Sequence, residues 1–553
     1  MLPFGVSLEQ FKFLVLSNLN RACIWRTDFI PGISLRICAG QFNLRAIAVS
    51  ITASKPFAAL SEPKERKIIL LLCCLAAVHV FVFSAAFPFF NNVDEQQHFD
   101  LAVNYSHGHL PRGLEPVSKE SMQYVVVYGS QEFLLSPEFF PDGKFPPPPW
   151  TQPVDKIAPL LLAKESAGRA ADYEVSQPPL YYALAGLWWH VGRWCGFEGG
   201  RLLYWLRFLN IFFVAAFVWL GYFTARTIFP EKKFLRLGVP ALLAFMPQSA
   251  FYSIQNDVPS PLCFGAAFIL LLKFSSAETP GVRLGTATGL ALAATLLTKM
   301  SNLPLLAVSV AFITLKIFRL AKAGKLRAAA PSILALALCA GLPMAVWMAW
   351  CKYNFGDLTG SQLKIHFLGW TLKPLGDWWH HPIFTPAGFS TFISDLTAAF
   401  WRGEIRWHRN LQTTWLVDSI YTFSTICFVG VTAISLLRRS MIATAEQRRA
   451  LCLGLAGFAA LIVFLALLSV IYDFHDCHYP SRDYPYFISG RLMLGALIPF
   501  MLVYLYGLDR LLSRFKNNWA KPLALAGMVL FMLVSEIADN WTVFSSQYNW
   551  FHM

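Results

Sequence analysis

Eleven apolar runs, most of them long enough to cross a lipid bilayer as a helix, constrain this chain more than any other feature of its sequence. A spanning helix needs about 20 mainly apolar residues. Hydrophobic residues make up 56% of the 553 positions and charged residues only 14%, whereas soluble proteins average roughly 45–50% and about 25%. Composition therefore excludes a soluble globular enzyme and a disordered chain. It predicts an all-α polytopic membrane protein with about eleven transmembrane helices, at 67–88, 204–225, 237–253, 258–274, 284–298, 303–318, 328–350, 415–437, 450–472, 489–509 and 522–540.

Lysine and arginine gather in every second connection between these runs, which sets the orientation. Cytoplasmic loops carry an excess of these residues. Lys64, Arg66 and Lys67 precede the first run, and the basic loop 226–236 follows the second. We therefore expect a cytoplasmic N-terminus and an extracytoplasmic C-terminal tail at 541–553. The net charge of +14 is explained by this topology and does not indicate a nucleic-acid partner.

The alternation also divides the chain into regions. Residues 1–66 form a predicted cytoplasmic extension, although a misassigned start codon would explain 1–62 equally well. Residues 67–540 form the transmembrane domain. It carries two large extracytoplasmic loops, 89–203 and 351–414, and loops of this length in a compact protein are usually functional.

The segment 178–196 is apolar, but counting it as a span would place the basic 226–236 loop outside the cell. We therefore expect an amphipathic or re-entrant segment at the outer interface, with Tyr181, Tyr182, Trp188 and Trp189 as an aromatic belt. The alternative is a twelfth span.

Polar residues gather just after the first span, where Asp94, Glu95 and His98 stand near the hydrocarbon boundary. Acids at this depth are costly to ionise without a partner and indicate a functional site. Partial desolvation would raise the pKa of a carboxyl towards the range of a general base. The structural alternative is that the acids cap the following helix.

Further polar residues stand at the other outer ends, and the span centres are nearly free of charge. The Lys299 ammonium suits an anionic head group, and the Arg491 guanidinium suits a phosphate. The structural alternative for Arg491 is an ion pair with Asp94 or Asp257, and for Asp257 a helix cap. The predicted substrate-binding residues are His98, Gln177, Asn256, Asp257, Lys299, Asn302 and Arg491.

Five short motifs resemble the GT-C superfamily of membrane glycosyltransferases, which use polyprenyl-phosphate sugars, and most closely its bacterial members of unassigned substrate. They are VDEQQHF at 93–99, QPPLYYAL at 177–184, MPQSAFYSIQND at 246–257, LTKMSN at 297–302 and ISGRLMLGALIP at 488–499. The resemblance implies a GT-C-like fold in a bacterial inner membrane, with an active site open to the periplasm.

The resemblance also implies a reaction. Asp94 matches the acid expected to act as catalytic base, with Glu95 the close alternative. A sugar would pass by inverting displacement from a polyprenyl-phosphate donor to a glycan, lipid or protein acceptor of the cell envelope. No cofactor is required by the sequence, and a divalent cation (Mg²⁺ or Mn²⁺) at Asp94, Glu95 or Asp257 is left open.

Two other functions share these features. A transporter or flippase for a lipid-linked glycan or another anionic substrate would predict polar residues deep within spans, and often internal repeats. An O-antigen ligase or polymerase shares the substrate class, but typically places its large loop later in the chain than 89–203.

Overall fold

The computed structural model describes residues 62–133, 135–166, 170–438, 444–477, 479–515 and 517–552. These described residues belong to one compact unit. Nearly all of the predicted N-terminal extension, 1–66, lies outside the described residues, which begin at Glu62 in helix α2.

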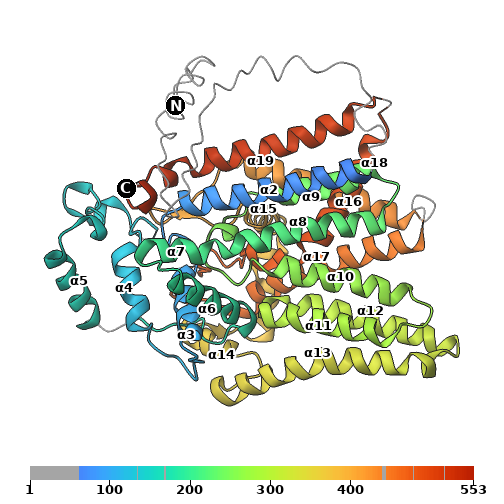
Figure 1. The fold of residues 1–553 in the computed structure, drawn as a ribbon, viewed down its shortest axis with the longest axis horizontal. Helices are drawn as coiled ribbons and strands as arrows, with labels where there is room; N and C mark the ends of the chain where they lie inside the picture. The colour runs from blue at the N-terminus through green and yellow to red at the C-terminus, as the bar shows by residue number, and fades with distance from the viewer. Residues whose placement is uncertain are drawn as a thin grey trace. The chain divides into compact units, whose positions relative to one another are not determined.

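Each of the eleven predicted runs carries a helix, and the helices lie side by side in Figure 1. Proline stands in the first turn of α10 and α12, where its missing N–H breaks no helical hydrogen bond. The bounds are α2 Glu62–Ala86, α8 Leu209–Ile228, α9 Lys233–Ala244, α10 Ser260–Ser276, α11 Val282–Thr298, α12 Leu303–Lys322, α13 Leu326–Phe355, α16 Trp415–Leu437, α17 Ala445–Ile471, α18 Leu497–Leu512 and α19 Ala520–Phe544.

Eight helical segments of the described chain are long and apolar enough to cross a membrane. Helices α10 and α11 are apolar but shorter. Helix α9 has 12 residues with Pro240 inside it, and at 1.5 Å per residue it covers only about 18 Å of a hydrocarbon core about 30 Å thick. The all-α prediction is confirmed, while the count of about eleven spans stays a prediction.

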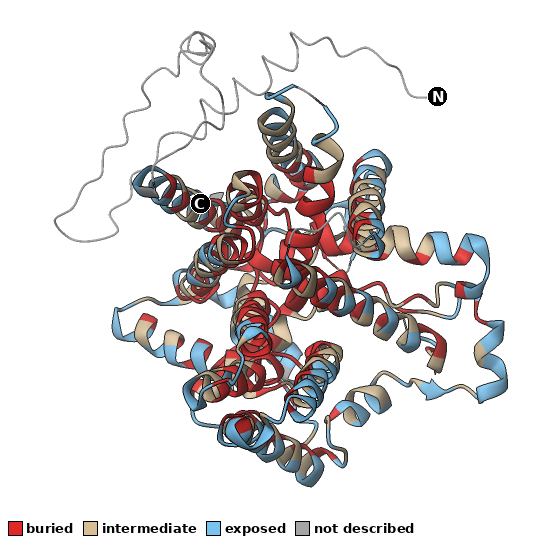
Figure 2. Cartoon of the chain, turned by 90° about the vertical axis from the view of Figure 1, so that its right-hand side faces the viewer, coloured by how far each residue is buried: buried red, intermediate tan, exposed pale blue. Residues whose placement is uncertain are grey.

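Burial separates central from peripheral helices. The segment Gly490–Leu512, which contains α18, has 94% of its apolar window buried, against 17% for Ala520–Phe544 in α19. Figure 2 shows the same difference: buried residues gather at the centre of the helix bundle, and exposed residues lie at its periphery. The apolar outer faces of α13, α16 and α19 are therefore the lipid-facing surfaces expected of a membrane protein.

The first large loop is folded into helices that lie together at one end of the spans (Figure 1). The stretch FPPPPW at 145–150 has little regular structure before a short 3₁₀ turn, η3. The other short turns are η1 Pro137–Phe139 and η2 Pro141–Gly143. The loop helices are α3 Glu95–Ser106, α4 Lys119–Tyr128, α5 Val154–Ser166, α6 Pro179–Trp194 and α7 Gly199–Arg207, with η3 at Pro149–Thr151.

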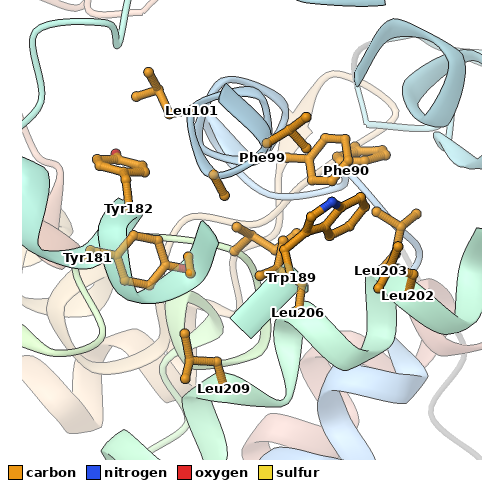
Figure 3. Close-up of a cluster of buried hydrophobic side chains, with 14 of the residues drawn as sticks. Phe90, Phe99, Leu101, Tyr181, Tyr182, Trp189, Leu202, Leu203, Leu206 and Leu209 are labelled. Carbon is orange, nitrogen blue, oxygen red and sulfur yellow. The ribbon is translucent and has the colours of Figure 1, made fainter. Parts of the chain in front are cut away.

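Helix α6 corresponds to the predicted interfacial segment, and its 16 residues are not among the candidate spans of the described chain. The expected aromatic belt is wrong in one respect. Tyr181, Tyr182 and Trp189 are fully buried, because α3 and α7 pack against α6 and form an aromatic core with it. Figure 3 shows Trp189 beside Phe99 and Phe90, and Tyr181 and Tyr182 next to each other in the same cluster.

The second large loop is also ordered, and it contributes to the core. Helix α13 extends to Phe355, beyond the predicted end of its span, and the inner face of α15 is buried from Phe392 to Trp401. Two short antiparallel ladders fix the loop, β1 with β4 and β2 with β3. The elements are α14 Ser361–Phe367, β1 Thr371–Leu372, η6 Leu375–His380, η7 Pro382–Phe384, α15 Pro386–Arg402, β2 Arg406–Trp407, β3 Asn410–Leu411 and β4 Tyr472–Asp473.

Three further 3₁₀ segments lie in the connections between spans or at the start of a span. They are η4 Ser249–Tyr252, η5 Met300–Asn302 and η9 Gly490–Ala496. The C-terminal tail folds back as η10 Trp550–His552, and its Asn549 donates a hydrogen bond of 2.6 Å to the carbonyl of Ala86 at the end of α2. The end of the first span is thereby held against the tail.

Candidate functional site

Asp94 stands at the N-terminal cap of α3 in a left-handed backbone conformation, with φ 60° and ψ 9°. Asp adopts this region more readily than most residues. Its Oδ2 lies 2.5 Å from Nη2 of Arg491, and its Oδ1 accepts a hydrogen bond of 2.7 Å from the Tyr173 hydroxyl. The carboxylate is 12% exposed, so it is partly open to solvent.

Arg491 reaches Asp94 from η9, at the start of the tenth predicted span. Gly490 before it packs so closely on α15 that a Cβ would lie 2.0 Å from the backbone nitrogen of Phe400. The absence of a side chain at Gly490 lets η9 sit deep in the helices and sets the depth of the guanidinium. Nη1 of Arg491 lies 3.4 Å from Oδ2 of Asp257 and 3.5 Å from Oε1 of Gln255.

The connection between α9 and α10 supplies Asn256 and Asp257. Gln248 anchors this connection by donating to the carbonyls of Ala399 and Phe400, at 3.1 and 2.8 Å. From the end of α11, Nζ of Lys299 lies 2.5 Å from Oδ2 of Asp257 and 2.9 Å from Oδ1 of Asn256. These side chains are almost fully buried.

Gln177 joins this network to a second ion pair that the sequence did not predict. It accepts from Nδ2 of Asn256 at 3.0 Å and donates to Oε2 of Glu174 at 2.5 Å. The other oxygen of Glu174 accepts from Nζ of Lys364 on α14, and this ammonium also lies 5.0 Å from the centroid of the Tyr173 ring. The sequence signal was weak: Glu174 precedes Gln177 by three residues, and Lys364 was one of many cations in its loop.

Six charged side chains thus form what we call the charged cluster: Asp94, Glu174, Asp257, Lys299, Lys364 and Arg491. It contains three carboxylates and three cations from six separate stretches of chain. Exposure increases from Asp257, at 1%, to Lys364, at 30%. The cluster therefore has a closed inner end and an open outer end, at which Asp94 and Lys364 lie.

The pKa of Asp94 moves in the direction opposite to the sequence prediction. Burial alone would raise it, but the charges of Lys364 and Arg491 and the hydrogen bond from Tyr173 lower the pKa below its ordinary value. For Lys364, burial favours the neutral form, yet Glu174 and Asp94 outweigh it and raise the pKa. The expectation of a raised carboxyl pKa at Asp94 is wrong because it left out the neighbouring cations.

His98 lies beside the cluster as a neutral group. Burial and the charge of Lys299 hold its pKa well below the ordinary value. Its Nδ1 lies 2.7 Å from the Tyr182 hydroxyl, and Nε2 is buried without a hydrogen-bond partner among the described residues. An unpaired buried polar atom is unusual in a folded protein.

Glu95 is not brought into the charged cluster. Both of its oxygens accept from Arg207, with Nε and Nη2 each at 2.8 Å, and the backbone N–H of Ile254 donates to it at 3.0 Å. Arg207 also donates to three backbone carbonyls around the end of α2, those of Ser84, Phe87 and Pro88. This enclosed pair joins α3 and α7 to the end of α2 and leaves Glu95 no open face for a substrate.

Asn302 is likewise outside the cluster. Its Nδ2 donates to Oγ of Ser260 at 3.2 Å and to the carbonyl of Thr295 at 2.9 Å, which ties the start of α12 to α10 and α11. Gly495 on η9 lies so close that a Cβ there would meet Oδ1 of Asn302 at 2.2 Å. Asn302 therefore positions helices around the site.

Glu404 is a second buried acid near Arg491 that the sequence did not single out. Its Oε2 accepts from the Ser489 hydroxyl at 2.9 Å, and its Oε1 has no partner among the described residues. Burial raises its pKa, partly opposed by the charge of Arg491. Arg491 therefore has carboxyl groups from three different loops around it.

A polar pair also lies between two spans, where the sequence predicted almost no charge. Nε2 of His79 on α2 lies 2.8 Å from Oε2 of Glu536 on α19, and the Tyr252 hydroxyl donates to the other oxygen. Tyr252 ends η4, in the connection that carries Asn256 and Asp257. The prediction of nearly uncharged span centres fails for this pair, which fastens the site connection to two spans.

The residues do not fit a divalent cation in this arrangement. Asp94 and Asp257 lie against Arg491 and Lys299, and Glu95 is paired with Arg207. No three His, Cys, Asp or Glu side chains among the described residues are grouped so that they could hold a metal ion.

Comparison with known proteins gives a family match. A family model described as "Predicted membrane protein (DUF2142)" matches residues 77–473, which include most of the spans and both large loops. No curated protein matches the chain.

Proposed function

The chain belongs to the family of predicted membrane proteins DUF2142 and is a multi-pass membrane protein, and from this premise we propose that it is a GT-C-type glycosyltransferase. It would transfer a sugar from a polyprenyl-phosphate donor to a glycan, lipid or protein acceptor of the cell envelope. The proposed location is the bacterial inner membrane, with the N-terminus in the cytoplasm and the site facing the periplasm.

One observation carries the proposal. Residues from segments up to 397 positions apart converge on Asp94 and Arg491 at one end of the spans, and the open side of this cluster presents a carboxylate next to cations. A carboxylate can accept the proton of an attacking hydroxyl. Cations can stabilise the charge that develops on a departing phosphate.

The proposed reaction is a single displacement at the anomeric carbon. The acceptor oxygen forms a bond to this carbon from one face while the bond to the phosphate oxygen breaks on the other, which inverts the configuration. The hydroxyl proton passes to Asp94, and the bonding electrons leave with the lipid phosphate. In this proposal Lys364 and Arg491 bind the phosphate, and Lys299 holds Asp257 and Asn256 behind them.

The ion pair of Asp94 with Arg491 gives a way for donor binding to prepare the base. While paired, Asp94 is a weak base because its pKa is lowered. A phosphate that engages Arg491 and Lys364 would neutralise the two cations that contribute most to this lowering. Donor binding would therefore raise the proton affinity of Asp94 as the acceptor arrives.

The test is transfer of radiolabelled sugar from membrane-extracted donor lipid by the purified chain in detergent. We expect Asp94→Asn to lower the rate by about 10³-fold, within the range of general-base catalysis, with an unchanged elution profile. Asp142→Asn is the matched control, because Asp142 is an exposed acid of the same loop that lies in η2, outside the charged cluster. Full activity of Asp94→Asn would overturn the assignment of the base.

A second candidate function is a transporter or flippase for a lipid-linked glycan or another anionic substrate. The buried His79–Glu536 pair favours it, since ionisable residues within spans commonly mark transport pathways. Transport needs two compartments, whereas sugar transfer proceeds in detergent. A chain that moves labelled lipid across vesicles, that loses this activity in Glu536→Gln and that forms no glycosidic product in detergent would establish the transporter.

A further inference from the structure

The second large loop carries an exposed apolar patch where it turns into α15. Leu375 and Trp379 on η6, Phe384 on η7 and Phe389 on α15 are 72%, 75%, 56% and 56% exposed. The rings of Trp379 and Phe384 lie 5.7 Å apart. We call these four side chains the loop patch. Soluble monomers seldom expose large apolar surfaces of this kind, and such a surface usually marks a site of interaction.

The backbone that carries the loop patch is held by the rest of the fold. The Thr385 hydroxyl accepts a hydrogen bond of 3.0 Å from the backbone N–H of Gly388 and so caps α15. Gly388 packs so closely on Pro382 that a Cβ would meet the Pro382 carbonyl oxygen. Nε2 of His381 lies 3.0 Å from the carbonyl oxygen of Pro485. The apolar side chains are therefore presented to the outside by a fixed turn.

The C-terminal end of α15 lies deep between two candidate spans, α16 and α17. Nε1 of Trp401 donates a hydrogen bond of 2.9 Å to the hydroxyl of Thr425 on α16, and the Phe400 ring lies 5.5 Å from the Phe458 ring on α17. At 1.5 Å per residue, Thr425 is about 15 Å from the start of α16 and Phe458 about 20 Å from the end of α17. Both helix ends are predicted to face the periplasm, so α15 reaches the depth of the hydrocarbon core.

The first half of α15 lies nearer the outer end of the spans. The Thr422 hydroxyl, about 10 Å from the start of α16, donates to the carbonyl of Ser394 at 3.3 Å. From Ser394 to Trp401 the helix therefore descends by about 5 Å. The same slope, continued back, places Phe389 about 6 Å from the outer end of α16. This is the depth at which head groups meet acyl chains.

The residues around the loop patch suit that depth. Asp377 is the only Asp, Glu, Lys or Arg in the sequence from 374 to 394. Trp and other aromatic rings are favoured at the boundary between head groups and acyl chains. The exposed apolar surface also continues on α16, where Phe423 is 74% exposed. A soluble partner would have to cover an apolar surface at a depth that lipid already occupies.

We propose that the loop patch is inserted into the outer leaflet of the bilayer and that its partner is phospholipid at the boundary between head groups and acyl chains. The segment from 375 to 402 is then a membrane-embedded part of the loop that the sequence predicted to be extracytoplasmic. The inserted helix carries the backbone of Phe400, on which Gln248 and Gly490 rest. The outer leaflet thus supports the segment that sets the depth of Arg491, whatever reaction the chain performs.

Photolabelling of the full chain in phosphatidylcholine nanodiscs tests the proposal. The probe is a phosphatidylcholine with a diazirine in the upper part of one acyl chain, and peptide mapping by mass spectrometry locates the label. We expect the label at 375–389 to be within about threefold of that at Phe423, as expected for a segment inserted at the interface. Phe139 is the matched control, because it is an aromatic residue of the first large loop with 60% exposure. Its label should be at least about tenfold lower.

A double variant gives a second measurement. Phe384→Asp/Phe389→Asp places two charges in the inserted surface, and we expect it to lower the label at 375–389 by about fivefold, because acids are unfavourable in the bilayer. Both positions are exposed, so the elution profile should stay unchanged. Phe139→Asp should leave the label at 375–389 unchanged.

Three outcomes would overturn the proposal. The first is a label at 375–389 no higher than that at Phe139. The second is an unchanged label at 375–389 in Phe384→Asp/Phe389→Asp. The third is strong labelling of 375–389 by a water-soluble diazirine in the same nanodiscs. Protection of the loop patch from both reagents would indicate that a second copy or another protein covers it, and would also overturn the proposal.

Discussion

Asp94 and Glu95 are neighbours in sequence, and the structure gives them opposite surroundings. Asp94 lies in a partly open cluster with Arg491 and Tyr173, whereas Glu95 is enclosed in a two-pronged pair with Arg207. Asp94 has a left-handed backbone conformation in the connection that follows the first span, and Glu95 is the first residue of α3. The two carboxylates therefore point to different partners. Adjacent acids of similar chemistry can therefore have different exposures and different partners.

The sharpest test of this division is Glu95→Gln. We expect it to lower the free energy of unfolding by about 3–5 kcal/mol, because it leaves the buried Arg207 guanidinium without its counter-charge. Thermal unfolding in detergent and the yield of folded chain measure the loss. The transfer rate per folded molecule should stay close to that of the wild type. A stable Glu95→Gln protein that has lost transfer would contradict the division and make Glu95 a part of the site.

Arg491→Lys tests the surroundings of Asp94, the other acid of this comparison. A single ammonium cannot place one nitrogen on Asp94 and another on Asp257, as the guanidinium does with Nη2 and Nη1. We expect the transfer rate to fall by about 10²-fold, similar to the loss of one oxyanion-stabilising donor, with a small change in stability. Arg402→Lys changes a comparable pair with Asp418 outside the cluster and should keep most of the activity. Equal losses in both variants would indicate a general structural effect.

Lys364→Met probes the open end of the charged cluster. Lys364 is 30% exposed and holds Glu174, so we expect a decrease in transfer of about tenfold, seen mainly in the apparent affinity for the donor lipid. Lys373→Met, in the same loop but away from Glu174, is the control. An unchanged donor affinity in Lys364→Met would remove Lys364 from the proposed phosphate contacts.

The smallest expected effect is that of pH between 7 and 5. The pKa of Asp94 in the folded chain is below its unfolded value of about 3.9. Its ion pair therefore stabilises the fold above pH 4 or so and is lost only as the pH falls through the lowered pKa. His98 stays neutral over the same interval because its pKa is also lowered. We expect the transfer rate to change by less than about twofold.

A steep acidic limb in that interval would have a different origin. Glu404 is the group beside Arg491 whose pKa is raised, so Glu404→Gln should remove such a limb. A limb that persists in Glu404→Gln would mean that Glu404 is not its origin. The measurement is the pH profile of the initial transfer rate in detergent.

The sequence was sufficient to predict the helices of the eleven apolar runs and many residues of the charged cluster, but not most helices of the two large loops. Apolar periodicity and length locate the spans, and polar residues at one side of them gave Asp94, Asp257, Lys299 and Arg491. Which acid pairs with which cation was harder to predict. The structural alternative of an ion pair between Arg491 and Asp94 or Asp257 is what the structure contains, and both acids lie against the same guanidinium.

What the sequence could not provide came from contacts between distant segments. Glu95 and Arg207 are separated by 112 positions, and Glu174 and Lys364 by 190. No local pattern distinguishes a carboxylate that will meet a buried arginine from one that will stay open. The same reason explains why the pKa of Asp94 was expected to rise, since its cations come from other loops.

Gly490 has no side chain, yet the position of Arg491 depends on it. Adding one methyl group at this position would place it against the backbone of Phe400, and η9 would have to retreat from α15. Arg491 would move with it, so every carboxylate that shares the guanidinium would lose its partner together. A variant at Gly490 would therefore lose activity because Arg491 is too far from its carboxylates, although every charged side chain is still present.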